Sequence, residues 1–157
     1  MAFDTPAGTR GARAPRSSGP VMRWISRWME RRIRRKGYRL MGMDVLFLTT
    51  IGRKTGVRRE TPVAWFPAGQ DAWLIVASAA GSPRNPDWYR NLAAHPDQVW
   101  IELPGRKLKV VAEQLSGAPR AECWQRITAA QSRYAKYQQK TDRELPVIRL
   151  VACPPES

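Results

Sequence analysis

Short apolar runs that follow one another closely are the feature that most limits how this chain can fold. The first three span residues 44–51, 61–66 and 72–77, and three more lie at 98–102, 107–113 and 143–152. Gly, Pro and Asp separate them at short turns, which favours antiparallel pairing over a doubly wound sheet. The pattern predicts a mainly β (α+β) domain: a barrel of about six antiparallel strands with flanking helices.

Two helices are expected to interrupt these strands. Asn85, Pro86 and Asp87 suit the N-cap, N1 and N2 positions of a helix that stops before Pro96. A second helix begins near residues 116–119, and its spacing places on one side a set of mainly apolar residues: Cys123, Ile127, Ala130, Tyr134 and Tyr137.

The positive charge is concentrated at the N-terminal end. The chain of 157 residues has a formal net charge of +14, of which residues 1–40 carry +9, with ten Arg and one Lys against two acids. Such a charge indicates an anionic partner. We expect a disordered basic arm over 1–19, an amphipathic helix over 20–37 that Pro20 and Gly37 delimit, and one barrel domain over 38–157.

The helix expected at 20–37 has one apolar stripe, with arginines around the rest of the wheel. The stripe consists of Val21, Trp24, Ile25, Trp28, Met29 and Ile33. It can pack on the domain's own core, or lie peripherally on an anionic membrane, and both alternatives stay open. Nucleic acid is not expected as a partner, because the aromatic residues share their face with aliphatic ones and form no stacking platform.

Compartment and metal content follow from a few residue types. Two cysteines thirty positions apart and a single histidine provide no zinc site and no disulfide framework. No apolar segment follows the N-terminal charges, so neither a secretory signal nor a transmembrane span is expected. We therefore predict a cytoplasmic protein, with the inner face of the cell membrane as the alternative location.

A basic turn, Gly52–Arg59, lies between two of the apolar runs. Two glycines frame it, and it carries four cations: Arg53, Lys54, Arg58 and Arg59. Backbone N–H groups and positive charge concentrated at a chain reversal favour an anion site, with a solvated hairpin tip as the alternative. It is no P-loop, because a strand follows where a helix should.

A second candidate segment leaves a buried strand in small residues, Ala77 to Ser82. Small side chains let a flat ring approach the backbone closely, although a plain flexible loop has the same composition. The single histidine and the lack of a G-x-S-x-G sequence leave no nucleophile triad. A cofactor or polyanion site remains.

These motifs, in this order, resemble those of the deazaflavin-dependent nitroreductase family, whose members use coenzyme F420. The resemblance covers about residues 21–152 and rests on four blocks: 48–56 with Arg59 and Pro62; 76–78; 81–92 with Ala94 and Pro96; and 134–137 with 141–143 and Pro146. It implies a split β-barrel of the flavin-reductase or FMN-binding type. Monomer and homodimer both stay open.

The resemblance also implies roles for individual residues. The phosphate and polyglutamate tail of the cofactor would be held by Arg53, Lys54 and Thr55, with Arg58 and Arg59. The deazaflavin ring would be lined by Ala77, Ser78, Ala79 and Ala80, and the other wall closed by Asn85, Trp88 and Asn91. The substrate side and any proton would come from Ser78, Tyr134 and Tyr137.

The implied reaction is hydride transfer from reduced coenzyme F420 to a quinone, a nitro compound or an activated enone, without a metal. Family members can carry a further aromatic one turn before the first tyrosine, where this chain has Ala129, Ala130 and Gln131. A wider or more polar substrate pocket would follow, which counts against nitroreductase activity more than against quinone reduction, because quinones are bulky. Alternatives are a non-catalytic deazaflavin or flavin carrier, and a basic adaptor that binds membrane or nucleic acid.

Overall fold

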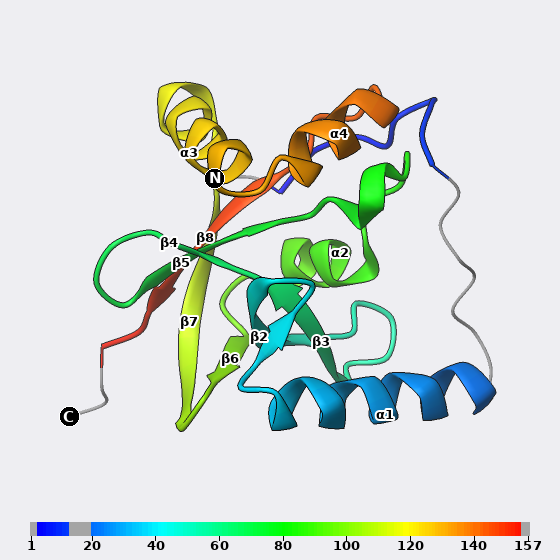
Figure 1. The fold of residues 1–157 in the computed structure, drawn as a ribbon, viewed down its shortest axis with the longest axis vertical. Coiled ribbons are helices and arrows are strands. Elements are labelled where there is room, and N and C mark those ends of the chain that lie inside the picture. Colours follow the sequence, from blue (N-terminus) through cyan, green and yellow to red (C-terminus); the bar gives the residue numbers. More distant parts are fainter. Residues whose placement is uncertain (1–2, 13–19, 155–157) are drawn as a thin grey trace.

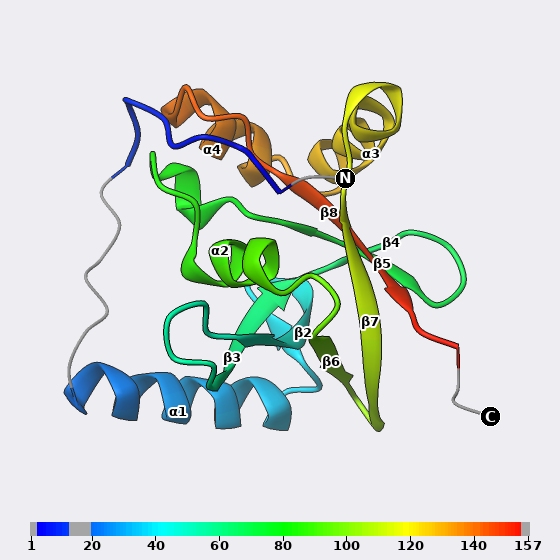
Figure 2. The ribbon, with the colours of Figure 1, turned by 180° about the vertical axis from the view of Figure 1, so that it is seen from behind.

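The computed structural model describes residues 3–12 and 20–154, with the side chains of the first helix described from Trp24 onward. Within these ranges, four α-helices surround a strongly curled antiparallel sheet, with α1 at one end and α3 and α4 at the opposite end (Figures 1 and 2). Residues 1–2 and 13–19 of the expected basic arm lie outside the described residues. Its remaining part, residues 3–12, runs beside α4 in both views.

The sheet contains eight strands among the described residues, and all its pairs are antiparallel. Their order is β1-β2-β6-β7-β8-β5-β4, and β3 also pairs with β2. The strands are β1 (Arg39–Leu40), β2 (Met43–Ile51), β3 (Arg58–Ala64), β4 (Phe66–Pro67), β5 (Ala72–Val76), β6 (Val99–Leu103), β7 (Arg106–Gln114) and β8 (Val147–Ala152). The prediction of an antiparallel split barrel is confirmed.

Strand β2 is buried on both faces, as its unbroken apolar run predicts. Leu46 and Leu48 belong to the main core inside the curl, while Val45 and Phe47 pack with Ile33 of the first helix. The strand therefore separates two apolar clusters. Because a one-residue slip would exchange the two sets, this burial fixes the register of β2 and with it the turn that follows.

Helix α1 (Pro20–Arg35) ends at the glycine that the sequence indicates. Gly37 has a φ of 75°, and the N–H of Tyr38 donates to the carbonyl oxygen of Ile33 at 2.9 Å, as in a Schellman motif. Ile33 is buried, but Trp24 and Trp28 are 69% and 50% exposed. Of the expected apolar stripe from Trp24 onward, where side chains are described, only the C-terminal part packs on the barrel.

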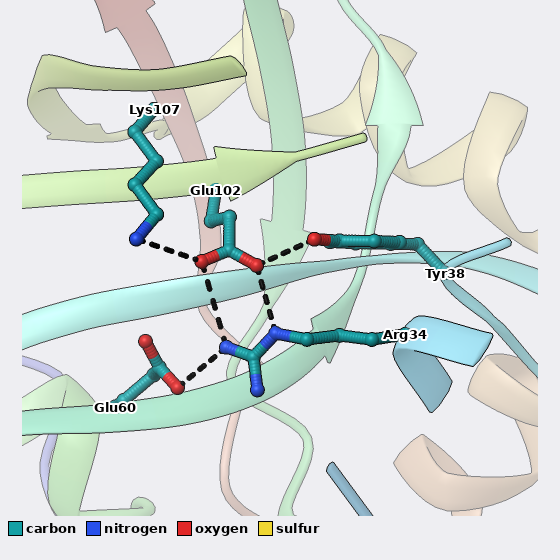
Figure 3. A network of polar contacts seen from close by, with 5 residues as sticks. All are labelled: Arg34, Tyr38, Glu60, Glu102 and Lys107. Carbon is teal, nitrogen blue, oxygen red and sulfur yellow. Dashed lines mark hydrogen bonds and ion pairs between the residues drawn. The ribbon is translucent and has the colours of Figure 1, made fainter. Parts of the chain in front are cut away.

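A polar network holds that C-terminal part in place (Figure 3). Glu102 of β6 accepts hydrogen bonds from Arg34 Nε at 2.9 Å and from the Tyr38 hydroxyl at 2.6 Å, and its other oxygen lies 3.5 Å from Lys107 Nζ. Arg34 also pairs with Glu60 of β3 at 2.8 Å. The network joins the end of α1 to three strands: β3, β6 and, through Lys107, β7.

The remaining helices are α2 (Asp87–Ala94), α3 (Gly117–Ala130) and α4 (Arg133–Lys140). We expected one long helix where α3 and α4 lie. The chain instead breaks at Gln131, whose φ and ψ of −141° and 98° are extended. The break redirects α4, so that Ile127 of α3 and Tyr134 of α4 both enter one apolar cluster.

Two strands begin three or more residues away from the expected positions. Strand β3 begins at Arg58 rather than residue 61, because Arg58 and Arg59 pair with Ile51 and Thr50 of β2. Strand β8 begins at Val147 rather than residue 143, after Pro146, which has no N–H to donate to a ladder. The basic turn is accordingly shorter than the sequence suggests, and Arg143 lies in a loop.

Candidate functional site

The turn between β2 and β3 closes on itself through its glycines. The N–H of Gly52 donates to the carbonyl oxygen of Val57, and the N–H of Gly56 to that of Gly52, both at 2.8 Å. A Cβ on Gly52 would lie 2.6 Å from the Thr55 hydroxyl oxygen, and Gly56 has a φ of 69°. Both glycines are therefore needed for the tight reversal that presents Lys54 to solvent.

Arg53 joins this turn to α2. Its backbone N–H and its Nη1 both donate to Asn91 Oδ1, at 3.2 and 3.1 Å, and its Nη2 lies 3.5 Å from Asp87 Oδ1. Asn91 is buried, and its Nδ2 lies 3.4 Å from the Thr50 hydroxyl oxygen. The structure thus brings together two of the expected site residues, Arg53 and Asn91, and holds the turn against the helix.

The small-residue segment that follows β5 is organised by a residue that the sequence reasoning did not select. Arg143 is 2% exposed and lies directly beneath this segment. Its Nη1 and Nη2 donate to the carbonyl oxygens of Ala77 and Ser78, both at 2.9 Å, and its Nε to that of Ser82 at 3.1 Å. One guanidinium therefore satisfies three backbone acceptors of the loop.

The same loop contains left-handed backbone at Ala79 and Ala80, with φ values of 45° and 54°. Residues with a Cβ avoid this region, so other contacts must hold them there. Arg143 supplies such contacts, and burial lowers the pKa of its guanidinium, which forms no ion pair with an acid in the described part of the chain. The available signal in the sequence was an arginine at the first position of the run 143–152, within a block shared with the family.

Asn85 has a different role from the N-cap that we expected. Pro86 occupies the N-cap position of α2, without a side-chain cap. The side chain of Asn85 is engaged elsewhere, because its Oδ1 accepts from Arg143 Nη1 at 2.6 Å and its Nδ2 donates to the carbonyl oxygen of Thr5 at 2.9 Å. Asn85 consequently links the N-terminal segment, through Arg143, to the loop 77–82.

Trp88 and Tyr89 are neighbours on α2 with different surroundings. Trp88 is buried in the main core beside Leu92. The hydroxyl of Tyr89 donates to Gln114 Oε1 at 2.6 Å, and Tyr89 also lines a surface hollow. The structure does not bring Trp88 to that hollow.

Tyr134 and Tyr137 lie together on α4, next to the small-residue loop. Their rings meet edge to face with centroids 5.8 Å apart, and Tyr134 meets Phe66 in the same way at 5.6 Å. Burial raises the pKa of Tyr134 to about 12. A Cβ on Gly81 would lie 2.8 Å from the carbonyl oxygen of Tyr137, so the loop that begins at Ser78 packs closely on α4.

Two of the four cations of the basic turn, Arg53 and Arg58, line two different hollows. Arg53 lines a hollow of about 740 Å3 together with Arg84 and Arg90. The guanidinium of Arg58 instead stacks over Trp100, 4.5 Å from the ring centroid, in a separate hollow of about 410 Å3 on the β3–β6 face. The structure does not bring Arg58 to Arg53, and Arg59, the next residue of the strand, is exposed.

The larger hollow has the chemistry of a site for an acidic group. Three guanidiniums contribute to its wall, and no Asp or Glu does; the complete lining is Phe3, Thr5, Ala7, Arg53, Arg84, Asn85, Tyr89, Arg90, Ala93 and Ala94. A phosphate or a string of carboxylates fits such a wall. Among the described residues, no three His, Cys, Asp or Glu side chains gather as a metal-binding group.

Comparison with known proteins identifies the family of the chain. The family described as F420H(2)-dependent quinone reductase matches residues 21–152. An F420H(2)-dependent quinone reductase of Mycobacterium tuberculosis (strain ATCC 25618 / H37Rv) is 37% identical over 146 residues, covering 80% of this chain and 97% of the relative.

Solved structures show the same fold. A structure of an F420-H2 dependent reductase (FDR-A) superimposes with a TM-score of 0.61 at 34% identity, covering 68% of this chain and 92% of the other. A second solved chain, described as a domain-swapped dimer, has a TM-score of 0.62 at 31% identity, covering 84% and 99%. The expected deazaflavin-dependent family is confirmed: the chain belongs to the F420H(2)-dependent quinone reductase family.

Proposed function

We propose that this protein catalyses hydride transfer from reduced coenzyme F420 to a quinone. The observation that carries the proposal is the arginine-lined hollow, whose wall includes Arg84 and Asn85 just after the loop 77–82, in a chain of this family. Bound reduced coenzyme F420 supplies the hydride, and the protein supplies binding, orientation and exclusion of water. Nitro compounds and activated enones are further candidate acceptors.

The cofactor's phosphate and glutamate tail would meet the basic turn. Arg53 is held by Asn91 at 3.1 Å, so its position is set before any ligand arrives. Lys54, Thr55 and Arg59 are exposed around the same reversal. Arg58 would take part only by leaving Trp100. Preorganised cations lower the ordering cost of binding an acidic tail.

The ring would lie against the loop 77–80, which Arg143 holds in its left-handed form. Asn85 stabilises that loop through Arg143, and Trp88 supports α2 from within the core. Ser78, Tyr134 and Tyr137 would offer the acceptor a hydroxyl. Tyr137 is half-buried, which suits a group that must reach both a substrate and a proton source.

Two measurements test the proposal. Titration with coenzyme F420 should give micromolar or tighter binding, weakened about tenfold or more by Arg53→Ala with Lys54→Ala. Reduced cofactor should then be oxidised by quinones in a screen that includes nitroaromatics. Equal or tighter binding of FMN would overturn the cofactor assignment, and binding without turnover of any acceptor would favour a carrier protein.

We further propose that α1 contacts anionic membrane surfaces. Trp24, Ile25 and Trp28 are exposed on the part of the helix that does not pack on the barrel, with Arg27 and Arg31 exposed on the same helix. Exposed tryptophans among arginines suit the headgroup region of an anionic bilayer. Such a surface would bring the site to acceptors dissolved in the membrane. No helix in the described residues is long and apolar enough to cross a bilayer.

A further inference from the structure

Residues 3–12, here called the strap, lie outside the part of the chain that the family matches, yet they pack along the candidate site. The N–H of Thr5 donates to the Tyr89 hydroxyl oxygen at 3.1 Å, and Gln114 Nε2 donates to the Thr5 hydroxyl oxygen at 2.7 Å. The ring of Phe3 meets that of Tyr89 edge to face, with centroids 6.0 Å apart. The strap has no regular secondary structure, so contacts of this kind determine where it lies.

Two glycines let the strap approach the loop backbone closely. The N–H of Gly8 donates to the carbonyl oxygen of Pro83 at 2.7 Å, and that of Ala12 to the carbonyl oxygen of Gly81 at 3.0 Å. A Cβ on Gly8 would lie 2.5 Å from Asp142 Oδ1, and a Cβ on Gly11 would lie 2.5 Å from the Gly81 oxygen. Larger residues at these positions would therefore displace the strap without changing any candidate binding residue.

Asp142 binds the strap through hydrogen bonds to Thr9 and Arg10. Its Oδ1 accepts from the N–H groups of Thr9 and Arg10, at 2.8 and 3.0 Å, and its Oδ2 accepts from the Thr9 hydroxyl. These bonds, led by the one from the Thr9 hydroxyl, lower the pKa of Asp142 to about 2. The carboxylate of Asp142 is consequently ionised at neutral pH. Asp142 precedes Arg143 in the chain, so the residue that binds the strap is directly bonded to the residue that holds the loop 77–82.

Alternate residues of the strap, Phe3, Thr5 and Ala7, form one wall of the arginine-lined hollow. Arg84 and Arg90 contribute to the same hollow, and within the described residues no ion pair joins either of them to an acid. Their charge is available to an acidic ligand. A ligand beneath the strap would be partly shielded from water, which strengthens such contacts.

We propose that the strap closes over the acidic tail of the bound cofactor, with Arg84 and Arg90 contacting that tail beside Arg53, so that the cofactor leaves only when the strap opens. The inference rests on the proposed function, because it assigns the tail to this hollow. The strap adds to the site an element that the family match does not include.

Release kinetics test the strap. The fluorescence of the bound deazaflavin is followed in stopped flow for the full chain, for Gly8→Ala with Gly11→Ala, and for a variant that lacks residues 2–12. We expect release about tenfold faster in both variants, since interface changes act mainly on dissociation rates. Pro6→Ala changes an exposed side chain that does not line the hollow, and should stay within about twofold of the unchanged chain.

Two controls show whether the strap has moved and the fold has held. Trypsin cleavage after Arg10 should be slow in the unchanged chain and fast once the glycine substitutions displace the strap. Thermal unfolding reports whether the barrel is intact. If Gly8→Ala with Gly11→Ala still resists cleavage after Arg10, the substitutions have not displaced the strap. The release rate of the variant that lacks residues 2–12 then tests the proposal.

The ligand's chemistry is tested with a deazaflavin that lacks the phosphate and the glutamates. Arg84→Ala and Arg90→Ala should each raise the dissociation constant of the complete cofactor about fivefold and leave that of the tail-less compound unchanged. Arg149→Ala, which removes an exposed arginine on β8, is the matched control. Inorganic phosphate should compete with the complete cofactor. Phosphate that binds beside it without competition would assign the hollow to a separate anion and overturn the proposal.

The failures of the two proposals are distinguishable. If the unchanged chain does not bind coenzyme F420, the proposed function fails, and with it the strap. If it binds, but release is unchanged when trypsin shows the strap displaced or when residues 2–12 are absent, the strap inference alone is wrong.

Discussion

Arg143 Nη1 lies 2.6 Å from Asn85 Oδ1, across 58 positions of sequence. Arg143 also donates to the loop that would bear the ring, and Asn85 donates to Thr5 of the strap. This contact therefore joins the loop, the start of α2 and the strap.

Replacing Arg143 by Lys should disrupt the loop while keeping the positive charge. An ammonium lacks the planar fork that reaches Ala77, Ser78 and Ser82 together, so buried carbonyl groups lose their partners. We expect unfolding to become easier by about 3 kcal/mol, and binding of coenzyme F420 to weaken about tenfold. Urea unfolding and titration measure both. Arg149→Lys, at an exposed ion pair, is the control; equal small effects of the two variants would contradict the role of Arg143.

Glu102 should make stability depend on pH. Burial opposes its ionisation, but hydrogen bonds from Arg34 and Tyr38 outweigh this and lower its pKa. A folded-state pKa below the unfolded value gives a stabilisation that is present above about pH 4.3 and is lost as pH falls through the folded pKa. Glu102→Gln should cost about 1–2 kcal/mol at pH 7 and progressively less toward pH 3.

Urea unfolding of both proteins between pH 3 and pH 7 measures this difference. Glu113→Gln, which removes an exposed partner of Arg149, should show little pH-dependent change. A constant difference between Glu102→Gln and the unchanged chain at all pH values would contradict the assigned charge state.

The two tyrosines of α4 should contribute differently to turnover. The Tyr134 hydroxyl points to Met43 Sδ at 3.9 Å and its raised pKa keeps it protonated, whereas Tyr137 is half-buried. We expect Tyr137→Phe to lower kcat/KM for a quinone about tenfold or more, and Tyr134→Phe to have the smaller effect. Steady-state oxidation of the reduced cofactor measures both. The reverse order would place the acceptor beside Tyr134.

The exposed face of α1 should determine membrane binding. Trp24→Ser with Trp28→Ser should reduce partitioning onto vesicles rich in phosphatidylglycerol about tenfold or more, because two aromatic side chains no longer leave water. Val111→Ser changes an exposed apolar residue on β7 and serves as control. Gel filtration tests the alternative partner of this face, a second copy of the chain. If the unchanged chain is a dimer and the double tryptophan variant is a monomer, α1 packs against that second copy.

Residue patterns within single segments were enough for much of the fold. The unbroken apolar run of β2 predicted burial on two faces, and Gly37 predicted the end of α1, because each signal lies in neighbouring residues. The order of the Gly52–Gly56 and Asn85–Leu92 motifs identified the family. The same patterns placed Asn85 as an N-cap and joined α3 to α4, where contacts from distant segments decided otherwise.

The sequence by itself determined the antiparallel barrel, the basic turn and the deazaflavin-dependent family. Only the tertiary structure showed that Arg143 organises the loop, that Arg53 and Arg58 belong to different hollows, and that residues 3–12 pack along the site. These arrangements depend on hydrogen bonds and close backbone contacts between segments far apart along the chain. Such contacts leave no periodic pattern in either segment, whereas burial of a strand or the end of a helix does.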